Sequence, residues 1–417
     1  MGVILRRMLP SLIRVGSLEI ETADGFVGAY GDGTGPKIAV KVTDKAAERA
    51  LLLDPALALG ELYMDGRVLV TRGDLYDLLA LGARNMALEG GPRWLKWIEK
   101  ARVLTRALRQ RNDRFRARQH IAHHYDLNVR LYDLFLDLDR QYSCAYFERP
   151  TATLEEAQLA KKRHIAAKLL VDEGHDVLDI GCGFGGMALY LAEMAGARAV
   201  GVTLSKEQHA VATKRAIDSG LADRVQFALK DYRDVEEKFD RIVSVGMFEH
   251  VGAPGYDEYF RTVRRLLKDD GVMILHAIGR SAPPGATNPW IAKYIFPGGY
   301  IPAVSEVMAS IERVGLYVTD TEILRLHYAD TLKAWRERFM ARRDEAKAMY
   351  DERFCRMWEF YLAGSESSFR VDGHMVFQIQ LAKSQDIVPR TRDYVYDREA
   401  MLRRREGQKP ALRLAGE

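Results

Sequence analysis

The sequence predicts an α/β protein with a doubly wound, mainly parallel sheet, preceded by a smaller α+β domain. From about residue 160 onward, short apolar runs alternate with helical stretches, as strands and helices do around a parallel sheet. A cluster of glycines follows the first of these runs, where a strand would turn into a helix. The chain has 417 residues, which favours two domains over one.

The smaller domain is expected to span residues 1–100. Apolar alternation and turn residues predict a hairpin with strands near 17–22 and 37–43. Short helices follow, interrupted at Pro55 and Gly66, and a further helix is expected in "GDLYDLLALGARN". The first residues, "MGVILRRMLPSLIRVG", have neither a long apolar core nor a small-residue cleavage site, so we expect an N-terminal helix and not a signal peptide.

An arginine-rich stretch leads out of this domain. "RVLTRALRQRNDRFRAR" (102–118) holds seven arginines and one aspartate, and we expect a basic helical linker over 101–120 and a second domain over 121–417. The plain interpretation is a solvated helix face or linker. The sharper interpretation is contact with an anionic surface. Because no motif that reads DNA or RNA lies nearby, lipid head groups are favoured over nucleic acid.

The numbers and spacing of cysteine and histidine argue against disulfide bonds and a metal site. The three cysteines (Cys144, Cys182 and Cys355) are widely spaced, which predicts reduced thiols in a cytosolic protein. There is no C-x-x-C pair, and His123 and His124 have no third ligand at metal spacing, so no metal site is expected. No run of about 18 apolar residues occurs, so we expect a soluble protein without a membrane-spanning helix.

The second domain is expected to contain several strands and intervening helices. "MALYLAEMAG" and residues 205–220 read as helices, the latter opening at Ser205. "HMVFQIQLAK" near the end is expected to close the edge of the sheet. The remaining expected strands lie at 176–180, 198–204, 224–229, 239–245 and 271–278.

The glycine-rich stretch "VLDIGCGFGG" (177–186) allows two interpretations. Its spacing fits the G-x-G-x-x-G loop of dinucleotide-binding folds, but Thr203 stands where the second strand of such a fold would end in an acid. Asp179, just before the first glycine, instead gives the D-x-G-x-G pattern of S-adenosylmethionine-dependent methyltransferases, which we favour. Asp231 and Tyr232 follow the third strand, where such enzymes hold adenine; the plain alternative is an exposed loop.

Several further stretches occur in a family-specific order between about residues 120 and 385, and the chain resembles the cyclopropane fatty acid synthase family, relatives of the mycolic acid cyclopropane synthases. "ALGELYMDGRV" near the start resembles the front module of longer bacterial members. The motifs that carry the resemblance are "HHYDL" (123–127), "QYSCAYF" (141–147), "VLDIGCGFGG", "GVTLSKEQ" (201–208), "DYRD" (231–234), "SVGMFEHVG" (244–252), "LHAIGR" (275–280), "YIFPGGYIP" (294–302) and "HYADTLKAW" (327–335).

The resemblance implies a Rossmann-like class I methyltransferase domain with a seven-stranded, mainly parallel sheet. It also implies a cyclopropane-fatty-acyl-phospholipid synthase, which adds a methylene from S-adenosylmethionine across the cis double bond of an unsaturated phospholipid acyl chain. A carbocation forms and a bound bicarbonate removes a proton from the new methyl group. The cation needs a dry site and the base needs polar groups that hold it.

The resemblance assigns five positions to the bicarbonate site. Cys144 would contribute its backbone amide, so the reaction needs no thiolate nucleophile. Taken singly, each of the other positions also allows a purely structural interpretation, as a helix cap, a core histidine or a packing residue. The five are Cys144, Glu249, His276, Ile278 and Tyr328.

Ten positions are expected to hold S-adenosylmethionine. The aromatic and Gly/Pro-rich stretch 288–302 is expected to form a wall of the acyl tunnel or a lid. The ten cofactor positions are Tyr142 and Ser143 at the methionine end, Asp179, Gly181 and Gly183 in the glycine loop, Thr203, Leu204 and Gln208 towards the ribose, and Asp231 and Tyr232 at the adenine.

Partners and location follow from the same resemblance. We expect a peripheral association with a phospholipid bilayer on the inner face of the cell membrane, in a cytoplasmic protein that binds no nucleic acid, and a homodimer is typical of the family. Three other functions remain open: a fatty acyl C-methyltransferase that gives methyl-branched, methylene or furan-precursor lipids without ring closure, a small-molecule N-methyltransferase, and a non-catalytic lipid-binding protein.

Overall fold

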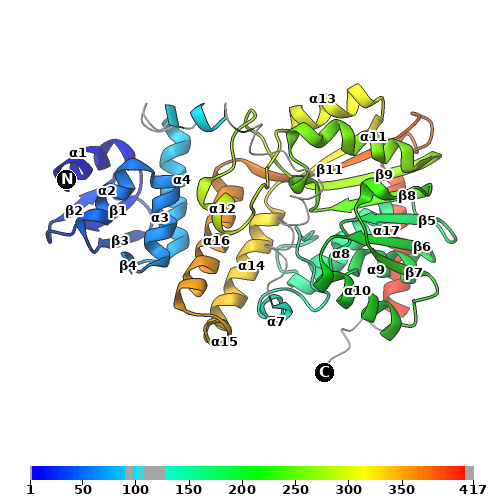
Figure 1. Cartoon of the computed structure of the whole chain (residues 1–417), viewed down its shortest axis with the longest axis horizontal. Coiled ribbons are helices and arrows are strands. Elements are labelled where there is room, and N and C mark those ends of the chain that lie inside the picture. The colour runs from blue at the N-terminus through cyan, green and yellow to red at the C-terminus, as the bar shows by residue number, and fades with distance from the viewer. Residues whose placement is uncertain (1, 90–96, 99, 104–105, 107–127, 409–417) are drawn as a thin grey trace. The chain divides into compact units, whose positions relative to one another are not determined.

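The computed structural model describes residues 2–89, 97–98, 100–103, 106 and 128–408 and divides into two compact units (Figure 1). The first unit comprises Met1–Arg106, Gly285–Pro297 and Leu332–His374; the second comprises Ala107–Pro284, Gly298–Thr331 and Met375–Glu417. A smaller N-terminal α+β part and a larger α/β part with a seven-stranded sheet are therefore confirmed. The boundaries at 100 and 121 stay predictions, because most of the expected linker lies outside the described residues, and two later segments pack with the N-terminal part.

The sheet of the first unit has four strands in the order β2-β1-β3-β4. The hairpin expected between 17–22 and 37–43 is wrong, because those two strands run parallel. A tight turn, in which Gly25 donates its N–H to the carbonyl of Thr22, joins β1 to β2 instead, and β2 is its antiparallel hairpin partner. The strands are β1 (Ser17–Glu21), β2 (Val27–Tyr30), β3 (Lys37–Val42) and β4 (Val68–Arg72).

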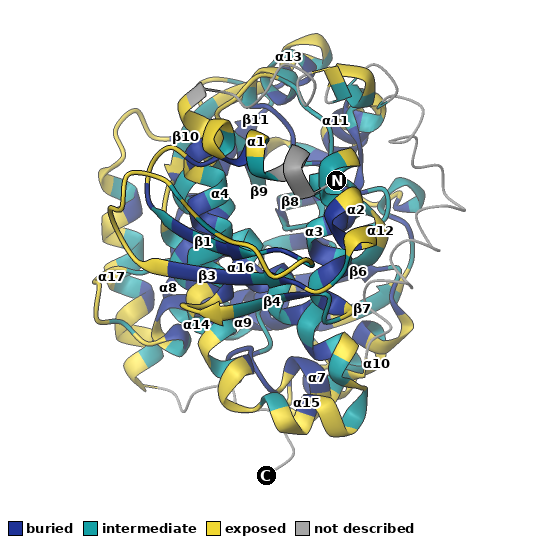
Figure 2. Cartoon of the chain, turned by 90° about the vertical axis from the view of Figure 1, so that its left-hand side faces the viewer, coloured by how far each residue is buried: buried dark blue, intermediate teal, exposed yellow. Residues whose placement is uncertain are grey.

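The helices of the N-terminal part lie close to where the sequence places them, whereas the three later helices of this unit had not been predicted. Asp54 ends α2, and its side chain caps α3, which has Pro55 at its first position, so the predicted interruption is confirmed. Figure 2 shows the buried stretches of β1 and β3, whose apolar side chains pack against these helices. The helices are α1 (Gly2–Leu12), α2 (Lys45–Leu53), α3 (Pro55–Met64), α4 (Leu75–Glu89), α12 (Pro289–Tyr294), α15 (Arg343–Met349) and α16 (Glu352–Val371).

Two segments from late in the sequence join the first unit because their aromatic side chains need a partner. Trp290 on α12 is buried against α3, where its indole N–H lies 3.3 Å from the sulfur of Met64. A Cβ atom at Gly60 would approach that indole nitrogen to 2.4 Å, so only glycine allows the ring to lie so close. Helix α16 packs against α3 and α4.

The second unit contains a seven-stranded sheet in the order β10-β11-β9-β8-β5-β6-β7. The five strands expected between residues 176 and 278 are present and pair in parallel, and the one at 225–229 forms one edge of the sheet. The expectation that residues 374–383 close the sheet edge is wrong. β11 is almost wholly buried, and β10, which is more exposed and antiparallel to β11, forms the edge. The strands are β5 (Asp176–Ile180), β6 (Arg198–Thr203), β7 (Val225–Leu229), β8 (Phe239–Val245), β9 (Leu267–Arg280), β10 (Tyr317–Leu324) and β11 (His374–Ala382).

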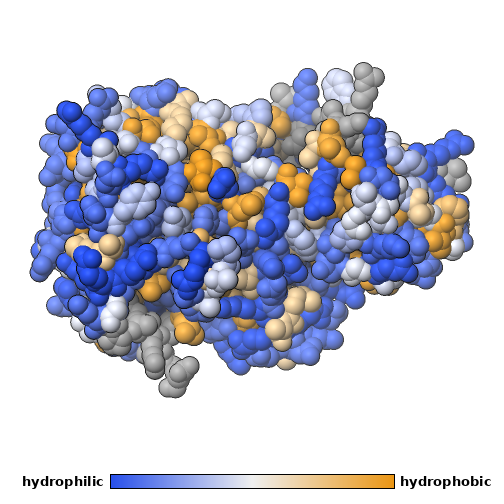
Figure 3. All heavy atoms as spheres, turned by 180° about the vertical axis from the view of Figure 1, so that it is seen from behind, coloured by the Kyte–Doolittle hydropathy of each residue, from blue (hydrophilic) through white to orange (hydrophobic). Residues whose placement is uncertain are grey.

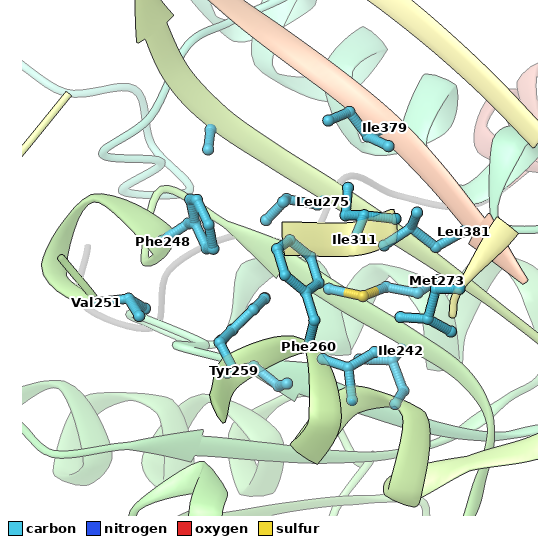
Figure 4. Packing of buried hydrophobic residues seen from close by; sticks show 14 of the residues in the cluster. Ile242, Phe248, Val251, Tyr259, Phe260, Met273, Leu275, Ile311, Ile379 and Leu381 are labelled. Atoms are coloured by element: carbon cyan, nitrogen blue, oxygen red, sulfur yellow. The ribbon is translucent and has the colours of Figure 1, made fainter. Parts of the chain in front are cut away.

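Alternation along the central strands sends side chains to two different layers. On β9, Met273 and Leu275 join the core under α11 and α13, while Ile274 joins the core under α8, α9 and α17. Figure 4 shows the first of these cores, with aromatic rings from α11 stacked towards the strand side chains. The helices of this unit are α7 (Val129–Tyr132), α8 (Leu154–Lys168), α9 (Gly186–Ala195), α10 (Lys206–Asp218), α11 (Tyr256–Leu266), α13 (Val304–Val314) and α17 (Asp393–Gln408), with short 3-10 turns η1 (Tyr232–Asp234), η2 (Phe248–His250) and η3 (Ala253–Gly255). Helix α14 (His327–Ala341) begins in the second unit and belongs to the first unit from Leu332 onward.

Helix α8 is unusual because its polar side chains are buried. Lys161, Lys162, His164 and Lys168 are each less than 5 % exposed. Charged groups leave water at a high cost unless they find partners, so each of them must be paired inside the protein. This helix therefore brings a set of fixed donors to the face of the sheet that carries the even-numbered residues of β9 and β11.

The described surface is mostly hydrophilic, with apolar residues in separate patches, as Figure 3 shows for one face. None of the helices in the described ranges has the length and apolarity needed to cross a membrane.

A matched pair of glycine substitutions tests how closely the glycine loop packs. Gly185 has φ +83° and a Cβ atom there would lie 2.5 Å from the Phe227 ring, whereas Gly220 has φ +67° with open space around it. Both alanine variants should cost about 1–2 kcal/mol for the left-handed backbone. Gly185→Ala should cost about 1–3 kcal/mol more for overpacking, measured by urea unfolding. Equal losses in the two variants would contradict the close packing.

Candidate active site

A single pocket at the carboxyl ends of β5, β6 and β8 collects all ten positions that the sequence assigned to a cofactor. This is the edge of an open parallel sheet where ligands bind in α/β folds. The three strands belong to the second unit, where β6 and β8 each pair with β5, so the pocket forms within that unit. The individual roles of the ten residues stay predictions.

The glycine loop brings the backbone close to the floor of the pocket. Gly181 has φ +80°, and a Cβ atom there would lie 2.7 Å from the side chain of Met247. Gly183 also has a positive φ, of +54°. Side chains at either position would strain the turn between β5 and α9, so the loop needs glycine for its conformation.

Asp179 lies at the end of β5 with one carboxylate oxygen, Oδ2, buried and without a hydrogen-bond partner within the described structure. Burial raises the pKa of this carboxyl to about 7, against the opposing effects of Lys161 and the Ala188 backbone N–H. The group is thus poised to accept a positively charged or N–H-bearing ligand.

The turn after β7 brings a buried ion pair to the pocket. Arg233 donates from its Nε to Asp231 Oδ1 over 2.9 Å and from a terminal nitrogen to Oδ2 over 2.7 Å. The Asp231 carboxylate is therefore held in a fixed orientation, and Arg233 is a pocket residue that the sequence analysis missed. Thr203 and Gln208 also line the pocket, and their side chains are 3.1 Å apart.

Residues 140–143 form one wall of the pocket, and α8 holds them from behind. Gln158 donates its amide N–H to the carbonyls of Gln141 and Ser143, over 3.1 and 2.9 Å. The Lys161 ammonium donates to the side chains of the same two residues, over 2.6 and 2.8 Å. Burial lowers the pKa of Lys161 to about 8, although Asp137 and Asp139 favour the charged form. The segment is therefore fixed in place by two residues one helical turn apart.

Asp139 ties the same segment to the glycine loop. Its carboxylate accepts hydrogen bonds from Lys162 over 2.5 Å and from Arg215. Although burial opposes ionisation, these two cations hold the pKa of Asp139 below its usual value. Arg215 also donates to the Phe184 carbonyl over 2.6 Å, so one buried network orients both walls of the pocket.

Behind the pocket, Glu249 and Ile278 are in direct contact. The Ile278 backbone N–H donates to Glu249 Oε1 over 2.6 Å, so the amide of this predicted ion-site residue supports the carboxyl. Glu249 Oε2 is buried, and no group in the described ranges bonds it. Burial raises the pKa of Glu249 to about 7, so the protonated and ionised forms are both populated at neutral pH.

His276 lies two residues before Ile278 on β9, and the two side chains point to the same face of the strand. Its Nδ1 lies 3.2 Å from Nε2 of Gln378, on β11. Its Nε2 is buried without a partner among the described side chains and backbone groups. Burial, together with the charges on α8, lowers the pKa of His276 well below its usual value, so the ring is neutral.

Cys144 and Tyr328 lie on two segments that contact each other. The Ala145 backbone N–H donates to Thr331 Oγ1 over 3.0 Å, one turn after Tyr328 on α14. The Cys144 thiol is buried, and burial raises its pKa, so it stays a neutral thiol. That Cys144 is not a nucleophile stays a prediction.

The pocket and the residues behind it adjoin at the end of β8. The Gly246 N–H donates to the His276 carbonyl over 2.9 Å, and Gly246 lines the pocket beside Ser143. The end of the stretch 288–302, which was expected to form a wall of the acyl tunnel, also lies here. The Tyr300 N–H donates to the Glu249 carbonyl over 2.9 Å. The role of the stretch as wall or lid stays a prediction.

Metal binding finds no support where the structure is described: no three His, Cys, Asp or Glu residues there could hold an ion together. His123 and His124 fall outside the described residues.

The residues that sequence reasoning missed are mainly the buried supports on α8 and β11. A run such as "AKKRH" normally marks a solvated helix face, and nothing local distinguishes a buried lysine from an exposed one. Gln378 had a weak signal, since a polar residue inside an otherwise apolar strand must find a partner when the strand is central. The supports are Gln158, Lys161, Lys162, Lys168, Arg215 and Gln378.

Comparison with known proteins agrees with this geometry. A family model described as mycolic acid cyclopropane synthetase matches residues 112–379, and a domain of unknown function matches residues 5–87. The cyclopropane-fatty-acyl-phospholipid synthase of Escherichia coli K12 is 39% identical over 82% of this chain and 87% of its own length. The tuberculostearic acid methyltransferase of Mycobacterium tuberculosis is 36% identical over 88% of each chain.

Solved structures are similar to the larger unit's fold. The cyclopropane synthase MmaA2 of Mycobacterium tuberculosis superposes with a TM-score of 0.60 at 35% identity, over 64% of this chain and 98% of that one. The mycolic acid cyclopropane synthase CmaA1, solved with S-adenosylhomocysteine and CTAB, gives a TM-score of 0.60 at 35% identity, over 63% of this chain and 97% of that one.

The raised pKa of Asp179 predicts a pH-dependent cost of folding. A carboxyl with a folded-state pKa of about 7 and an unfolded value of 3.8 binds its proton more tightly in the folded protein, so its contribution to stability is lost as pH rises through 7. We therefore compare the unfolding free energies of unliganded Asp179→Asn and unliganded wild type by urea titration. The difference between them should shift in favour of the variant by roughly 2–4 kcal/mol when the pH is raised from 4 to 8. A difference that is constant with pH would contradict the assignment.

Proposed function

The chain belongs to the mycolic acid cyclopropane synthetase family, and on that premise we propose that it is a cyclopropane-fatty-acyl-phospholipid synthase. Membership in this family makes it an S-adenosylmethionine-dependent enzyme of lipid modification. The finer proposal is that it converts the cis double bond of an unsaturated phospholipid acyl chain to a cyclopropane ring, with bound bicarbonate as the base.

The pocket fits S-adenosylmethionine. The cofactor carries a cationic sulfonium and an amino group, and an unpartnered carboxylate oxygen of Asp179 lies in the pocket. Asp231, fixed by Arg233, is suited to accept N–H groups of adenine. When bound, the cofactor supplies a methyl group on a sulfonium, which a double bond can attack if the two are held in line. Tyr142 and Ser143, fixed from behind by Gln158 and Lys161, would hold its methionine end.

The observation that carries ring closure is a pair of buried polar atoms behind this pocket that lack partners in the described structure. Glu249 Oε2 is an acceptor, or a donor when protonated, and His276 Nε2 belongs to a neutral ring. Buried polar atoms normally have partners, so these two support a polar ligand between or beside them. A bicarbonate ion fits, since it both accepts and donates hydrogen bonds, and it would supply a base that removes one proton.

The protein's own groups have three tasks in this mechanism. Glu249, positioned by the Ile278 amide, orients the base. Buried apolar residues beside Glu249, such as Phe248, are proposed to exclude water, which would otherwise quench the cation on the acyl chain. The Cys144 backbone amide and the Tyr328 hydroxyl are proposed as further donors to the ion. The cysteine thiol takes no part, because it is buried and neutral.

An alternative is a fatty acyl C-methyltransferase that does not close the ring. It is favoured by the relative that is named a tuberculostearic acid methyltransferase and matches most of both chains. The two functions share every step up to the cation and differ in what then happens to it: loss of a proton from the new methyl group with ring closure, or a hydride shift and proton loss that leave an alkene. The acidic and imidazole groups behind the pocket favour ring closure.

We further propose that the basic stretch 102–118 draws the protein to anionic phospholipid. Each arginine near such a surface contributes about 1 kcal/mol of attraction. Arg102 binds Asp54 over 2.8 Å and Arg106 contacts the Gly285 carbonyl, so these two support the first unit and the later arginines are the candidates for lipid contact.

Product analysis tests the proposed reaction. Full-length protein, S-adenosylmethionine and vesicles of cis-unsaturated phospholipid should give a cyclopropane acyl chain, identified by mass spectrometry and by its ring protons in NMR spectra, since an isomeric methylene product has the same mass. Glu249→Gln should lower the rate by roughly 100-fold or more with unchanged cofactor affinity. Glu312→Gln, an exposed residue on α13, is the matched control. A methyl-branched product would favour the alternative, and a fully active Glu249→Gln would refute the assignment of the base site.

Vesicle binding tests the membrane proposal. Replacing Arg109, Arg111, Arg114, Arg116 and Arg118 by glutamine in the full chain should weaken binding to anionic vesicles by two orders of magnitude or more, at about 1 kcal/mol per residue. Binding to zwitterionic vesicles should change little, and high salt should reduce the difference. If the variant co-sediments with anionic vesicles as well as the wild type does, the membrane proposal is wrong.

A further inference from the structure

A line of buried polar side chains runs from α8 across β11 to β9 and ends at His276. Lys168 donates from its ammonium to Gln378 Oε1 over 2.9 Å. The amide nitrogen of Gln378 lies 3.2 Å from His276 Nδ1. All three side chains are at most 2 % exposed, so water does not compete for these contacts. Lys168 is itself anchored by Glu322, on β10.

The chemistry of the first residue sets the direction of every bond in the line. An ammonium group has donors only, so the atom of Gln378 that faces Lys168 must be the amide oxygen. The amide nitrogen then faces His276, and because it also only donates, His276 Nδ1 must accept. A neutral imidazole that accepts at Nδ1 carries its proton on Nε2.

We propose that Lys168 and Gln378 are positioning residues that fix His276 in the Nε2–H tautomer, so that it presents a buried N–H donor to the anion behind the cofactor pocket. The proposal rests on the proposed function in one respect, the identity of that anion as bicarbonate. The tautomer itself follows from the protein's own groups.

The alternative tautomer would be unfavourable for an anion. With the proton on Nδ1, the lone pair of Nε2 would face the buried site, and an anion there would meet repulsion in place of a hydrogen bond. Losing a hydrogen bond to a charged group weakens binding roughly 10- to 100-fold. A neutral ring has a second advantage, because an imidazolium could protonate the very base that must accept a proton from the substrate.

The electrostatic surroundings keep the ring neutral. Burial is the main effect that lowers the pKa of His276, and Lys161, His164 and Lys168, all on α8, act in the same direction. Gln378, which approaches from β11, is uncharged. The line of donors therefore sets where the proton sits, and the cations of α8 prevent a second proton from binding.

The substitution Gln378→Glu tests this directly, because it keeps the shape of the side chain and reverses its role. A carboxylate accepts from Lys168 and from His276 alike, so Nδ1 must now carry a proton. Full-length protein labelled with 15N-histidine reports the protonation of each ring nitrogen, and the His276 signals are identified by their loss in His276→Gln. We expect a protonated Nε2 and a bare Nδ1 in the wild type between pH 6 and pH 9, and a protonated Nδ1 with a bare Nε2 in Gln378→Glu at pH 9.

Gln380→Glu is the matched control. Gln380 lies two residues further along the same face of β11, is equally buried, and donates to the Lys168 backbone carbonyl and not to His276. This variant should keep the wild-type tautomer. If Gln378→Glu does not fold, Gln378→Met removes the donor without adding charge and should populate both tautomers. A wild-type spectrum with a bare Nε2, or a Gln378→Glu spectrum with Nε2 still protonated and Nδ1 bare at pH 9, would overturn the proposal.

The functional readout separates this inference from the proposed function. In carbon-dioxide-depleted buffer, Gln378→Glu at pH 9 should need roughly 10- to 100-fold more added bicarbonate for half-maximal product formation, with unchanged affinity for S-adenosylmethionine. Lowering the pH should restore activity in part, because a cationic His276 regains its Nε2–H. If the spectra match expectation but product formation by the wild type does not depend on added bicarbonate, the assigned tautomer stands and the bicarbonate mechanism fails.

Discussion

The burial of positive charge on α8 is the constraint on which the candidate site depends. A lysine inside a protein must be held by acceptors, and the positions of those acceptors then determine the conformation of whatever carries them. Lys161 holds the side chains of Gln141 and Ser143, and Lys162 holds Asp139. Lys168 holds Gln378. One helix thereby orients a wall of the pocket, the support of the glycine loop and the partner of His276.

The same burial acts in opposite ways on the acids of the site. Asp139 lies between two cations and stays ionised despite its burial. Asp179 and Glu249 lack such close pairing, so burial raises the pKa of each to about 7. Asp139 thus differs from Asp179 and Glu249 in its partners and not in its burial, since all three are buried. Asp179 and Glu249 are costly to the unliganded protein, which is consistent with sites whose charges are completed by ligands.

Part of the fold could be predicted because its causes are local. The alternation of strand and helix from residue 176 onward, the glycine loop and the cap at Ser205 depend on short-range periodicity and backbone conformation. The errors concern pairing between distant segments. Residues 37–42 turned out to run parallel to 17–21, and β11 turned out to be internal, because strand order depends on which surfaces are buried once the chain has folded. Trp290 likewise packs on α3, more than two hundred positions earlier, which no local pattern could indicate.

By itself, the sequence determined the order of elements, the glycine-loop pocket and the residue types that gather at its edge, since each of these follows from local spacing and from motifs that resemble a known family. Only the tertiary structure decided which polar atoms are paired and which are left open. Lys168 and Gln378 are 210 positions apart, and Gln378 and His276 are 102 apart, so their contacts exist only in the folded chain. The physical reason is that a buried hydrogen bond has a direction set by its partner. The location of a proton on His276 is therefore a property of the fold, although the histidine itself could be singled out from the sequence.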